Sequence, residues 1–383
     1  MVKRFLSLVI CLTVFCSVVS VGKINIKALD GAEITAPSAI LIDADSGKVL
    51  FEKDSHQIRA CASITKVMTL LLVMEAIDSG KISLNDTVTA SAHAASMGGS
   101  DIWLETGETM SVDDMLKATV VASANDAAVA LAELISGTED EFVIQMNSRA
   151  KELGMNDTVF KNCNGLDEEG HLTSAYDVAI MSRELIKHEK IYDYTSIWID
   201  YLRDGKTQLV NTNKLLKSYN GITGLKTGTT SQAGCCISAT ARRNGLSLIA
   251  VVLGSTTGQQ RFKDASVLLD YGFANYEVAT LDIPQDLLSP LDVKKGMQKT
   301  AELSCTVADT ILINKGDKSK ITSEFYKDTE IEAPVLPNTQ VGTLTYKIGD
   351  NVIAEYPILT ADTVEEMTFK AVIKIMFDSL IKL

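Results

Sequence analysis

The sequence has little of the chemistry that holds metal ions. Its four histidines, His56, His93, His171 and His188, show no HExxH or similar spacing, and its seven cysteines include no CxxC pair. Metal sites in proteins usually draw on such closely spaced ligands. We therefore predict that the protein uses no metal and no cofactor.

The cysteines also argue against a disulfide scaffold. Two of the seven lie in the apolar N-terminal segment, and the five that follow are an odd number. Small disulfide-rich domains carry paired cysteines, so a leftover thiol speaks against that class. The five are Cys61, Cys163, Cys235, Cys236 and Cys305.

Positive charge is scarce relative to negative charge. The chain has 36 Lys and Arg against 49 Asp and Glu, for a net charge of −13. Such a surface repels nucleic acid, so we predict no nucleic-acid partner. The remaining composition, 46% hydrophobic and 22% charged over 383 residues, is that of a folded protein with two or three domains.

The N-terminus carries the features of a secretory signal. Lys3 and Arg4 precede the apolar run FLSLVICLTVFCSVVS, and the small residues Val18 and Ser20 suit a cleavage site after Ser20. We predict that residues 1–20 are a cleaved signal peptide, with an uncleaved anchor as the alternative. The mature protein is then expected outside the cytoplasmic membrane.

The C-terminal residues 362–383 predict an amphipathic helix. Thr363 and Glu366 have the spacing of a capping box. A charge every four residues argues against a bilayer span, so we predict peripheral attachment to the membrane surface. Packing on its own domain or on a second subunit is the alternative. The apolar face is Phe369, Val372, Ile373, Met376, Leu380 and Leu383, opposite Lys370, Lys374, Asp378 and Lys382.

The middle of the chain predicts two domains. Residues 36–275 begin with a β-hairpin around Asp45-Ser46-Gly47, continue through helices and return to three strands with a turn at Arg243-Asn244-Gly245. This order favours an antiparallel sheet covered by helices. Residues 276–360 alternate apolar and polar residues between turns, which indicates a small all-β domain.

One Ser-x-x-Lys pair stands out from the others. Ser63 opens a strongly apolar helix expected from about Ser63 to Asp78, and Lys66 follows one turn later on the same face. Serine at this point can be a plain helix cap. As a nucleophile it needs a base, and a desolvated lysine supplies one. Four such pairs occur: Ser20–Lys23, Ser63–Lys66, Ser148–Lys151 and Ser379–Lys382.

Two further motifs are ambiguous alone. Ser123-Ala-Asn125 lies in a polar break between apolar helices, where a helix cap is the simpler interpretation. Lys226-Thr227-Gly228 has the pattern of an edge strand, guarded by a lysine. The same strand can instead lie beside a substrate, because Gly228 permits close approach of the backbone.

In order along the chain, the three motifs resemble those of the penicillin-binding serine D-alanyl-D-alanine carboxypeptidases, the low-molecular-mass penicillin-binding proteins. The similarity includes ILIDADSGKVLFEKD, ASANDAAVALAE and GITGLKTGTTSQAGCC, and covers roughly Pro37 to Tyr276. It implies an α+β fold with a five-stranded antiparallel sheet covered by helices, an all-helical lobe and a small β-sandwich-like domain. It also implies cleavage of peptidoglycan stem peptides and acylation by β-lactam antibiotics.

The resemblance implies a role for each motif residue. Ser63 attacks the carbonyl of the penultimate D-alanine, with Lys66 as general base. Ser123 relays a proton to the leaving D-alanine in contact with Lys226, and Asn125 orients the substrate amide. The acyl-enzyme on Ser63 is then released by water.

The resemblance further implies a site for the terminal carboxylate of the substrate. The backbone N–H groups of Ser63 and Thr229 form the oxyanion hole, beside Gly228. Thr227 and Thr229 engage the carboxylate, with Arg242 as a further contact, although its neighbour Arg243 is an alternative.

Two departures and two rivals accompany this interpretation. Cys61 stands where the family commonly has proline, and is read as packing rather than as a reactive thiol. The middle motif reads Ser-Ala-Asn rather than Ser-Asp-Asn, which suits the carboxypeptidases better than class A β-lactamases.

A class A β-lactamase is the first rival, and it needs a glutamate for deacylation. Glu152 is the best candidate for that glutamate, but its position is more typical of the last turn of a helix that ends at Gly154. A non-catalytic protein that binds cell wall or β-lactam is the second rival.

Overall fold

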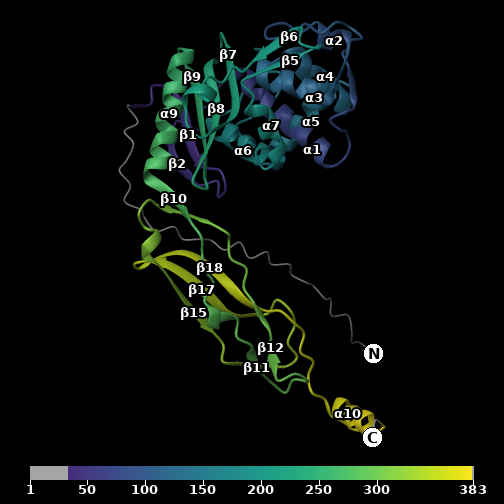
Figure 1. Ribbon diagram of the computed structural model, residues 1–383, viewed down its shortest axis with the longest axis vertical. Coiled ribbons are helices and arrows are strands. Elements are labelled where there is room, and N and C mark those ends of the chain that lie inside the picture. Colours follow the sequence, from purple (N-terminus) through teal and green to yellow (C-terminus); the bar gives the residue numbers. More distant parts are fainter. Residues whose placement is uncertain (1–32, 382–383) are drawn as a thin grey trace, which may run out of the picture. The chain divides into compact units, whose positions relative to one another are not determined.

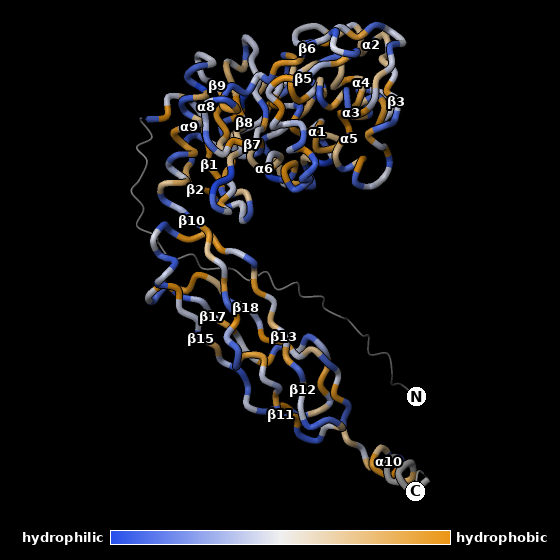
Figure 2. Tube along the Cα trace, in the orientation of Figure 1, coloured by the Kyte–Doolittle hydropathy of each residue, from blue (hydrophilic) through white to orange (hydrophobic). Residues whose placement is uncertain are grey.

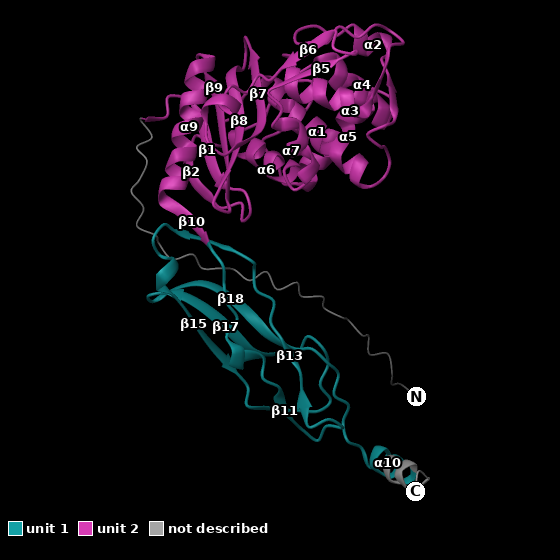
Figure 3. Cartoon of the chain, viewed as in Figure 1, with its two compact units in different colours: residues 1–25, 279–383 teal, residues 26–278 magenta. Residues whose placement is uncertain are grey.

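The computed structural model describes residues 33–381, which divide into two compact units (Figures 1 and 3). The larger unit extends to Val278, and the smaller begins at Ala279. Each has its own hydrophobic core, as expected for separate domains. The predicted signal peptide, residues 1–20, lies outside the described residues.

A five-stranded sheet forms the centre of the larger unit. Its order is β2-β1-β9-β8-β7 with antiparallel neighbours, which confirms the predicted sheet. The turn predicted between β8 and β9 is present, because Asn244 (φ 51°) and Gly245 (φ 84°) adopt the left-handed backbone it requires. The strands are β1 (Ser38–Asp43), β2 (Val49–Lys53), β7 (Ile222–Thr230), β8 (Gly234–Arg243) and β9 (Leu246–Ser255).

Helices cover both faces of the sheet. β1 is buried at all six residues, which is the pattern of a strand covered on both sides. α9 (Gly258–Asn275) lies on one side and α6 (Ala175–Leu185) on the other (Figure 1). Behind α6 runs the apolar helix α1 (Lys66–Asp78), which is buried almost all round, as its composition predicts.

The remaining elements of this unit form a largely helical lobe with two small hairpins. Its helices α4 and α5 pack on α1, and apolar residues line their contacts (Figure 2). The elements are β3 (Thr87–Thr89), α2 (Ala92–Ala95), β4 (Thr109–Ser111), α3 (Val112–Lys117), the π-helical turn η3 (Ala118–Ala122), α4 (Asn125–Ser136), α5 (Glu139–Glu152), η4 (Glu189–Ile191), α7 (Tyr192–Thr195), β5 (Ile199–Leu202), β6 (Thr207–Val210) and α8 (Leu215–Ser218).

The helix predicted from Ser63 begins later than expected. A short 3-10 turn, η2 (Ala62–Thr65), carries Ser63, and α1 starts only at Lys66. Neither element has a side-chain cap, so Ser63 is not used as a helix cap. The turn therefore leaves the Ser63 hydroxyl available for other contacts.

The smaller unit is a β domain, as predicted. Its main sheet has the order β13-β18-β17-β15, and a second sheet has the order β12-β11-β16. Apolar residues such as Leu344 and Ile358 of the main sheet form its core. The elements are β10 (Tyr276–Ala279) at the boundary, η5 (Gln285–Leu288), β11 (Leu291–Lys294), β12 (Thr300–Ala301), β13 (Leu303–Ser304), β14 (Ile311–Asn314), η6 (Lys318–Lys320), β15 (Ile321–Lys327), β16 (Glu330–Glu332), β17 (Gln340–Ile348) and β18 (Asn351–Thr360).

The C-terminal helix is present but begins later than predicted. α10 spans Phe369–Ile381, and the Thr368 hydroxyl accepts the N–H of Ala371 at its start. The predicted capping box is therefore wrong: Val364, inside it, pairs with Val335 in an isolated β-bridge instead. Among residues 33–381, none of the helices combines the length and apolarity needed to cross a bilayer.

Candidate active site

The turn η2 brings the serine and lysine of the first motif together. Lys66 Nζ lies 3.1 Å from Ser63 Oγ, 2.5 Å from Asn125 Oδ1 and 2.7 Å from the carbonyl oxygen of Asn164. Lys66 is fully buried. Burial strips the ammonium of water and lowers the pKa of Lys66 to about 7, against smaller opposing effects of nearby acidic groups.

The three contacts of Lys66 determine where its lone pair points. The oxygens of Asn125 and Asn164 can only accept hydrogen bonds, so each takes one N–H of the amine. A neutral amine has only two N–H groups, and both are then used. Its lone pair therefore faces the Ser63 hydroxyl, in the geometry that lets Lys66 accept the proton of the nucleophile.

The second motif is positioned by an unusual backbone. The π-helical turn η3 ends at Ser123, which adopts a left-handed conformation (φ 62°). Its Oγ accepts a hydrogen bond of 2.7 Å from Lys226 Nζ, which also donates to the carbonyl of Thr227 at 3.0 Å. Burial, then the charges of Lys66 and Arg261, lower the pKa of Lys226 well below its usual value.

Asn125 links the lysine to the neighbouring loop. Besides holding Lys66, its side-chain Nδ2 donates to the carbonyl of Gly98 at 2.7 Å, and its backbone N–H donates to that of Ser100 at 2.7 Å. The amide is thus fixed at both ends. It forms one wall of a site whose other components come from η2 and β7.

The third motif lies on an edge strand packed against the nucleophile. β7 pairs only with β8 in the described sheet, so its other edge faces η2. A Cβ at Gly228 would lie 2.7 Å from the carbonyl oxygen of Cys61 and 2.9 Å from the backbone nitrogen of Ser63. Glycine at this position is therefore required for the strand to approach the nucleophile so closely.

The two threonines of β7 differ in their surroundings. Thr229 is exposed, and its hydroxyl accepts a hydrogen bond of 2.9 Å from Arg261 Nη1. Arg261 also donates to the carbonyl of Gly228 at 2.9 Å. Thr227 is buried, and its hydroxyl donates a hydrogen bond of 2.7 Å to Thr212 Oγ1. Thr229 is thus the threonine that a ligand can reach.

Arg242, predicted to help bind a carboxylate, lies elsewhere, and that part of the prediction is wrong. It pairs with Ser247 at the far end of β8, whereas Cys235 of the same strand pairs with Thr229. Seven strand residues separate the two positions, or about 23 Å. Sequence reasoning missed Arg261 because it follows the other motifs inside a helix.

One signal in the sequence points to Arg261. It lies in the first turns of α9, capped by Thr257, where a positive charge opposes the helix dipole. The arginine is buried and bonded to β7 instead of to its own helix. A cation that is unfavourable for its helix is thus used by the site.

The residues behind the alternative interpretations lie outside this arrangement. Cys61 is fully buried, and burial raises the pKa of its thiol to about 11, so it is a packing residue and not a thiolate. Glu152 ends α5, is largely exposed and accepts a hydrogen bond from Arg149. The candidate base of a class A β-lactamase is therefore committed to a surface ion pair.

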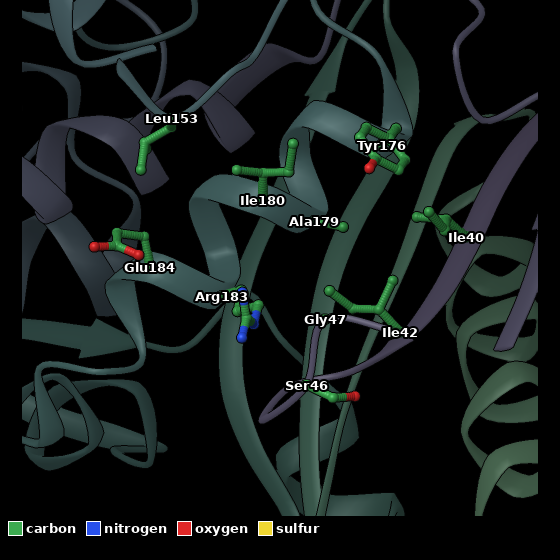
Figure 4. Close-up of a pocket in the computed structure, with 10 residues that line it drawn as sticks. All are labelled: Ile40, Ile42, Ser46, Gly47, Leu153, Tyr176, Ala179, Ile180, Arg183 and Glu184. Atoms are coloured by element: carbon green, nitrogen blue, oxygen red, sulfur yellow. The ribbon is translucent and has the colours of Figure 1, made fainter. Parts of the chain in front are cut away.

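A separate cavity lies between α6 and the β1–β2 hairpin (Figure 4). Its wall includes Tyr176 and Arg183 of α6, and Gly47 of the hairpin turn. Arg183 is used structurally, since it donates to the carbonyls of Ala44 and Asp45. None of the motif residues lines this cavity.

Family models match most of the chain. Residues 25–257 match the D-alanyl-D-alanine carboxypeptidase family, and residues 285–366 match the C-terminal domain of penicillin-binding protein 5. The chain is 46% identical over 343 residues to D-alanyl-D-alanine carboxypeptidase DacF of Bacillus subtilis, covering 88% of each chain.

Solved structures agree. Penicillin-binding protein 5 of Haemophilus influenzae is 31% identical and superimposes with a TM-score of 0.77, covering 89% of this chain and all of that one. Penicillin-binding protein D2 of Listeria monocytogenes, in its ampicillin-bound form, is 34% identical with a TM-score of 0.57. That match covers 62% of this chain and 97% of the Listeria chain.

Proposed function

The chain belongs to the D-alanyl-D-alanine carboxypeptidase family of penicillin-binding proteins, and on that premise we propose how its residues carry out the reaction. It is a serine-type carboxypeptidase, and therefore a hydrolase. The substrate in this proposal is the stem pentapeptide of peptidoglycan, which loses its terminal D-alanine. The observation that carries the assignment of roles is the set of three contacts around Lys66 Nζ.

Acylation begins with the neutral amine of Lys66. Its lone pair takes the proton of the Ser63 hydroxyl as Ser63 Oγ bonds to the carbonyl carbon of the penultimate D-alanine. The carbonyl π electrons move onto the oxygen, and the backbone N–H groups of Ser63 and Thr229 donate hydrogen bonds to the oxyanion that forms. The close approach of Gly228 to Ser63 supports this oxyanion hole, in which each donor is typically worth about 3 kcal/mol.

Collapse of this intermediate breaks the peptide bond. The leaving nitrogen of the terminal D-alanine takes the proton that Lys66 accepted from Ser63, relayed through Ser123, whose hydroxyl is held by Lys226. Lys66 is then neutral again. Asn125 orients the substrate amide beside Lys66. Water then gives a proton to Lys66 as it attacks the ester carbonyl, and that proton returns to Ser63 Oγ as the ester bond breaks, which releases the shortened peptide and restores the hydroxyl.

The terminal carboxylate binds at Thr229 and Arg261. Thr229 is the exposed threonine of β7, and Arg261 adds a positive charge next to it. A carboxylate that bonds to a hydroxyl and a guanidinium gains charge-assisted hydrogen bonds. Thr227 holds β7 in register through Thr212 and contributes indirectly.

β-Lactams acylate the same serine in this proposal. The Listeria relative was solved in an ampicillin-bound form, and its structure resembles this chain. The strained amide of a β-lactam takes the place of the D-Ala-D-Ala bond, and Ser63 forms the corresponding ester. The catalytic domain in this proposal extends over residues 36–275.

In this proposal, the two terminal segments direct the enzyme across the cytoplasmic membrane and attach it to the outer side of that membrane. Residues 1–20 act as a signal peptide, and α10 attaches the protein to the membrane surface. Phe369 and Phe377 of α10 are exposed, as are Lys370 and Lys374, which suits an interfacial helix. Deleting the residues after Thr368 should release the protein from membranes without disturbing the β-bridge at Val364. Unchanged sedimentation with membranes would refute this attachment.

Mass spectrometry of a pentapeptide ending in D-Ala-D-Ala tests the reaction. The enzyme should remove one D-alanine, and the Ser63→Ala variant should remove none. Fluorescent penicillin should label the wild type and leave the variant unlabelled. A labelled Ser63→Ala protein, or a wild type that releases no D-alanine, would show that the proposed mechanism is wrong.

A further inference from the structure

Trp103 occupies a position that a tryptophan rarely takes. Its backbone is left-handed (φ 55°), a conformation that residues with a Cβ disfavour. Its side chain is 79% exposed, so packing does not repay this conformation. A strained, exposed aromatic residue of this kind is a reason to look for a ligand.

One side of the Trp103 backbone is held by a buried carboxylate. Asp126 accepts hydrogen bonds from the backbone N–H groups of Ile102 at 3.1 Å and Leu104 at 3.0 Å. Asp126 is itself buried and directly follows Asn125 of the active site. The flanking residues are thus fixed to the helix that carries the Ser-Ala-Asn motif.

The other side is held by an arginine. Arg203 donates to the carbonyl of Ile102 at 2.8 Å and to that of Trp103 at 3.3 Å, and pairs with Glu108 at 2.7 Å. Its guanidinium is therefore occupied by the backbone and one carboxylate. Two charged side chains thus keep the backbone in place while the indole points into solvent.

The hairpin that leads to Arg203 exposes further apolar side chains. Ile199 and Tyr201 are two residues apart on β5, and Ile199 pairs with Val210 of β6, so the three share one face. Tyr201 is 51% exposed and its hydroxyl accepts a hydrogen bond from Gln208. We call the exposed residues Trp103, Ile199, Tyr201 and Val210 the apolar rim.

Both segments that carry the apolar rim are connected to residues of the active site. The loop that carries Trp103 is bonded to Asn125 through the carbonyls of Gly98 and Ser100. β6 ends two residues before Thr212, whose hydroxyl accepts a hydrogen bond from Thr227. Both segments are thus tied to active-site residues through short stretches of chain.

We propose that Trp103 and Tyr201 form a subsite for the sugar rings to which the stem peptide is attached. Pyranose rings present apolar C–H faces that stack on exposed aromatic rings, while phenol and amide groups such as those of Tyr201 and Gln208 bond to hydroxyls. A disaccharide joined to its peptide through an amide is uncharged, so the chain's net charge of −13 does not repel it. This inference rests on the proposed function, because it extends the substrate of the same site.

The experiment compares two substrates with the same pentapeptide, one free and one linked to its disaccharide. For the wild type we expect kcat/KM for D-alanine release to be about tenfold higher with the disaccharide, from a lower KM. Trp103→Gly should remove that preference and leave kcat/KM for the free peptide unchanged. Glycine suits the left-handed backbone, so this variant should melt at or above the wild-type temperature.

Control variants separate stacking from general effects. Trp103→Phe keeps a ring and should retain most of the preference. Tyr326→Ala removes a 71% exposed aromatic residue from the β domain and should retain all of it. A wild type without preference would overturn the subsite, as would a Trp103→Gly variant that keeps the preference or loses rate equally on both substrates.

A binding measurement distinguishes failure of the subsite from failure of the reaction. The chain has two tryptophans, Trp103 and Trp198. Disaccharide alone should change the tryptophan fluorescence of the Ser63→Ala protein, and Trp103→Phe should abolish that change. If neither peptide is hydrolysed, the proposed function fails, while a saturable fluorescence change that depends on Trp103 still supports the subsite. Absence of any Trp103-dependent change would overturn it.

Discussion

The chain contains Ser-x-x-Lys both at Ser63–Lys66 and at Ser148–Lys151, in very different surroundings. Lys66 is fully buried behind the turn η2, whereas Ser148 and Lys151 are exposed on α5. Burial brings the pKa of Lys66 to about 7, where a neutral amine is readily formed. The spacing brings two side chains together, but the surroundings determine whether one can take a proton from the other.

Two arginines repeat this lesson. Arg242 and Arg261 both follow the Lys226-Thr227-Gly228 motif along the chain, but Arg242 is exposed at the far end of β8. Arg261 is buried against the carbonyl of Gly228 and the hydroxyl of Thr229. Residue type and order along the chain do not distinguish the two.

The largest expected difference is between alanine variants of Ser63 and Ser148. Ser63→Ala should lower D-alanine release by at least about 10⁴-fold, because no other hydroxyl can form the acyl-enzyme. Ser148→Ala should leave the rate unchanged. Mass spectrometry of the pentapeptide measures the release of D-alanine. Mass spectrometry of the protein after incubation with penicillin tests the acylation, and a covalent adduct on the Ser63→Ala protein would contradict the assignment of the nucleophile.

The two lysines sharpen the comparison. Lys66→Arg replaces the base by a guanidinium that stays protonated, so acylation should slow by about 10³-fold. Lys151→Arg changes an exposed lysine and should have no effect. Stopped-flow acylation by a fluorescent penicillin gives both rates, and a Lys66→Arg protein within a few-fold of wild type would exclude Lys66 as the base.

Alanine variants of Arg261 and Arg242 should differ in KM, by a smaller factor than the rate effects above. Arg261→Ala removes a charge-assisted hydrogen bond at the carboxylate site, which should raise KM about 30-fold. Arg242→Ala should leave KM unchanged. Thermal melting identifies loss of folding, and Arg261→Lys, which keeps the charge, should recover part of the affinity. Equal effects of the two alanine variants would contradict the placement of Arg261 at the site.

The pH dependence of acylation follows from Lys66. Below its pKa of about 7 the amine is protonated and has no lone pair for the Ser63 proton. The acylation rate should therefore rise about tenfold from pH 6 to pH 8, because the neutral fraction rises by that factor. Circular dichroism over the same range controls for unfolding. A rate that is flat or falls across this range would refute a neutral Lys66 as the base.

The smallest effect concerns stability. A lysine whose pKa is lowered by folding binds fewer protons in the native than in the unfolded protein between about pH 7 and pH 10. The free energy of unfolding should therefore rise with pH there, by up to about 1.4 kcal/mol per pH unit for Lys66.

Urea unfolding at several pH values tests this slope. Lys66→Met should reduce it by the contribution of Lys66, and Lys151→Met should leave it unchanged. Lys226, whose pKa is also lowered, should supply part of the slope that remains. An identical slope in the wild type and Lys66→Met would show that burial does not shift Lys66.

Local chemistry made much of the fold predictable. Asn244 and Gly245 specify a turn, the apolar residues of α1 specify a buried helix, and the alternation of the smaller unit specifies strands. The C-terminal helix was predictable as a helix, but not where it starts. Val364 is bonded to Val335, nearly thirty residues earlier, and that pairing overrides the capping pattern at Thr363.

The sequence by itself determined which residues could do the chemistry: Ser63 with Lys66, Ser123 with Asn125, and Lys226 before Gly228. Only the tertiary structure decided how they meet, by joining a tight turn, a left-handed residue after a π-helical turn, and an edge strand. It also brought Arg261, and not Arg242, into contact with Thr229. The physical reason is that turns and helices depend on neighbours in the chain, whereas burial, desolvation and proton transfer depend on neighbours in space.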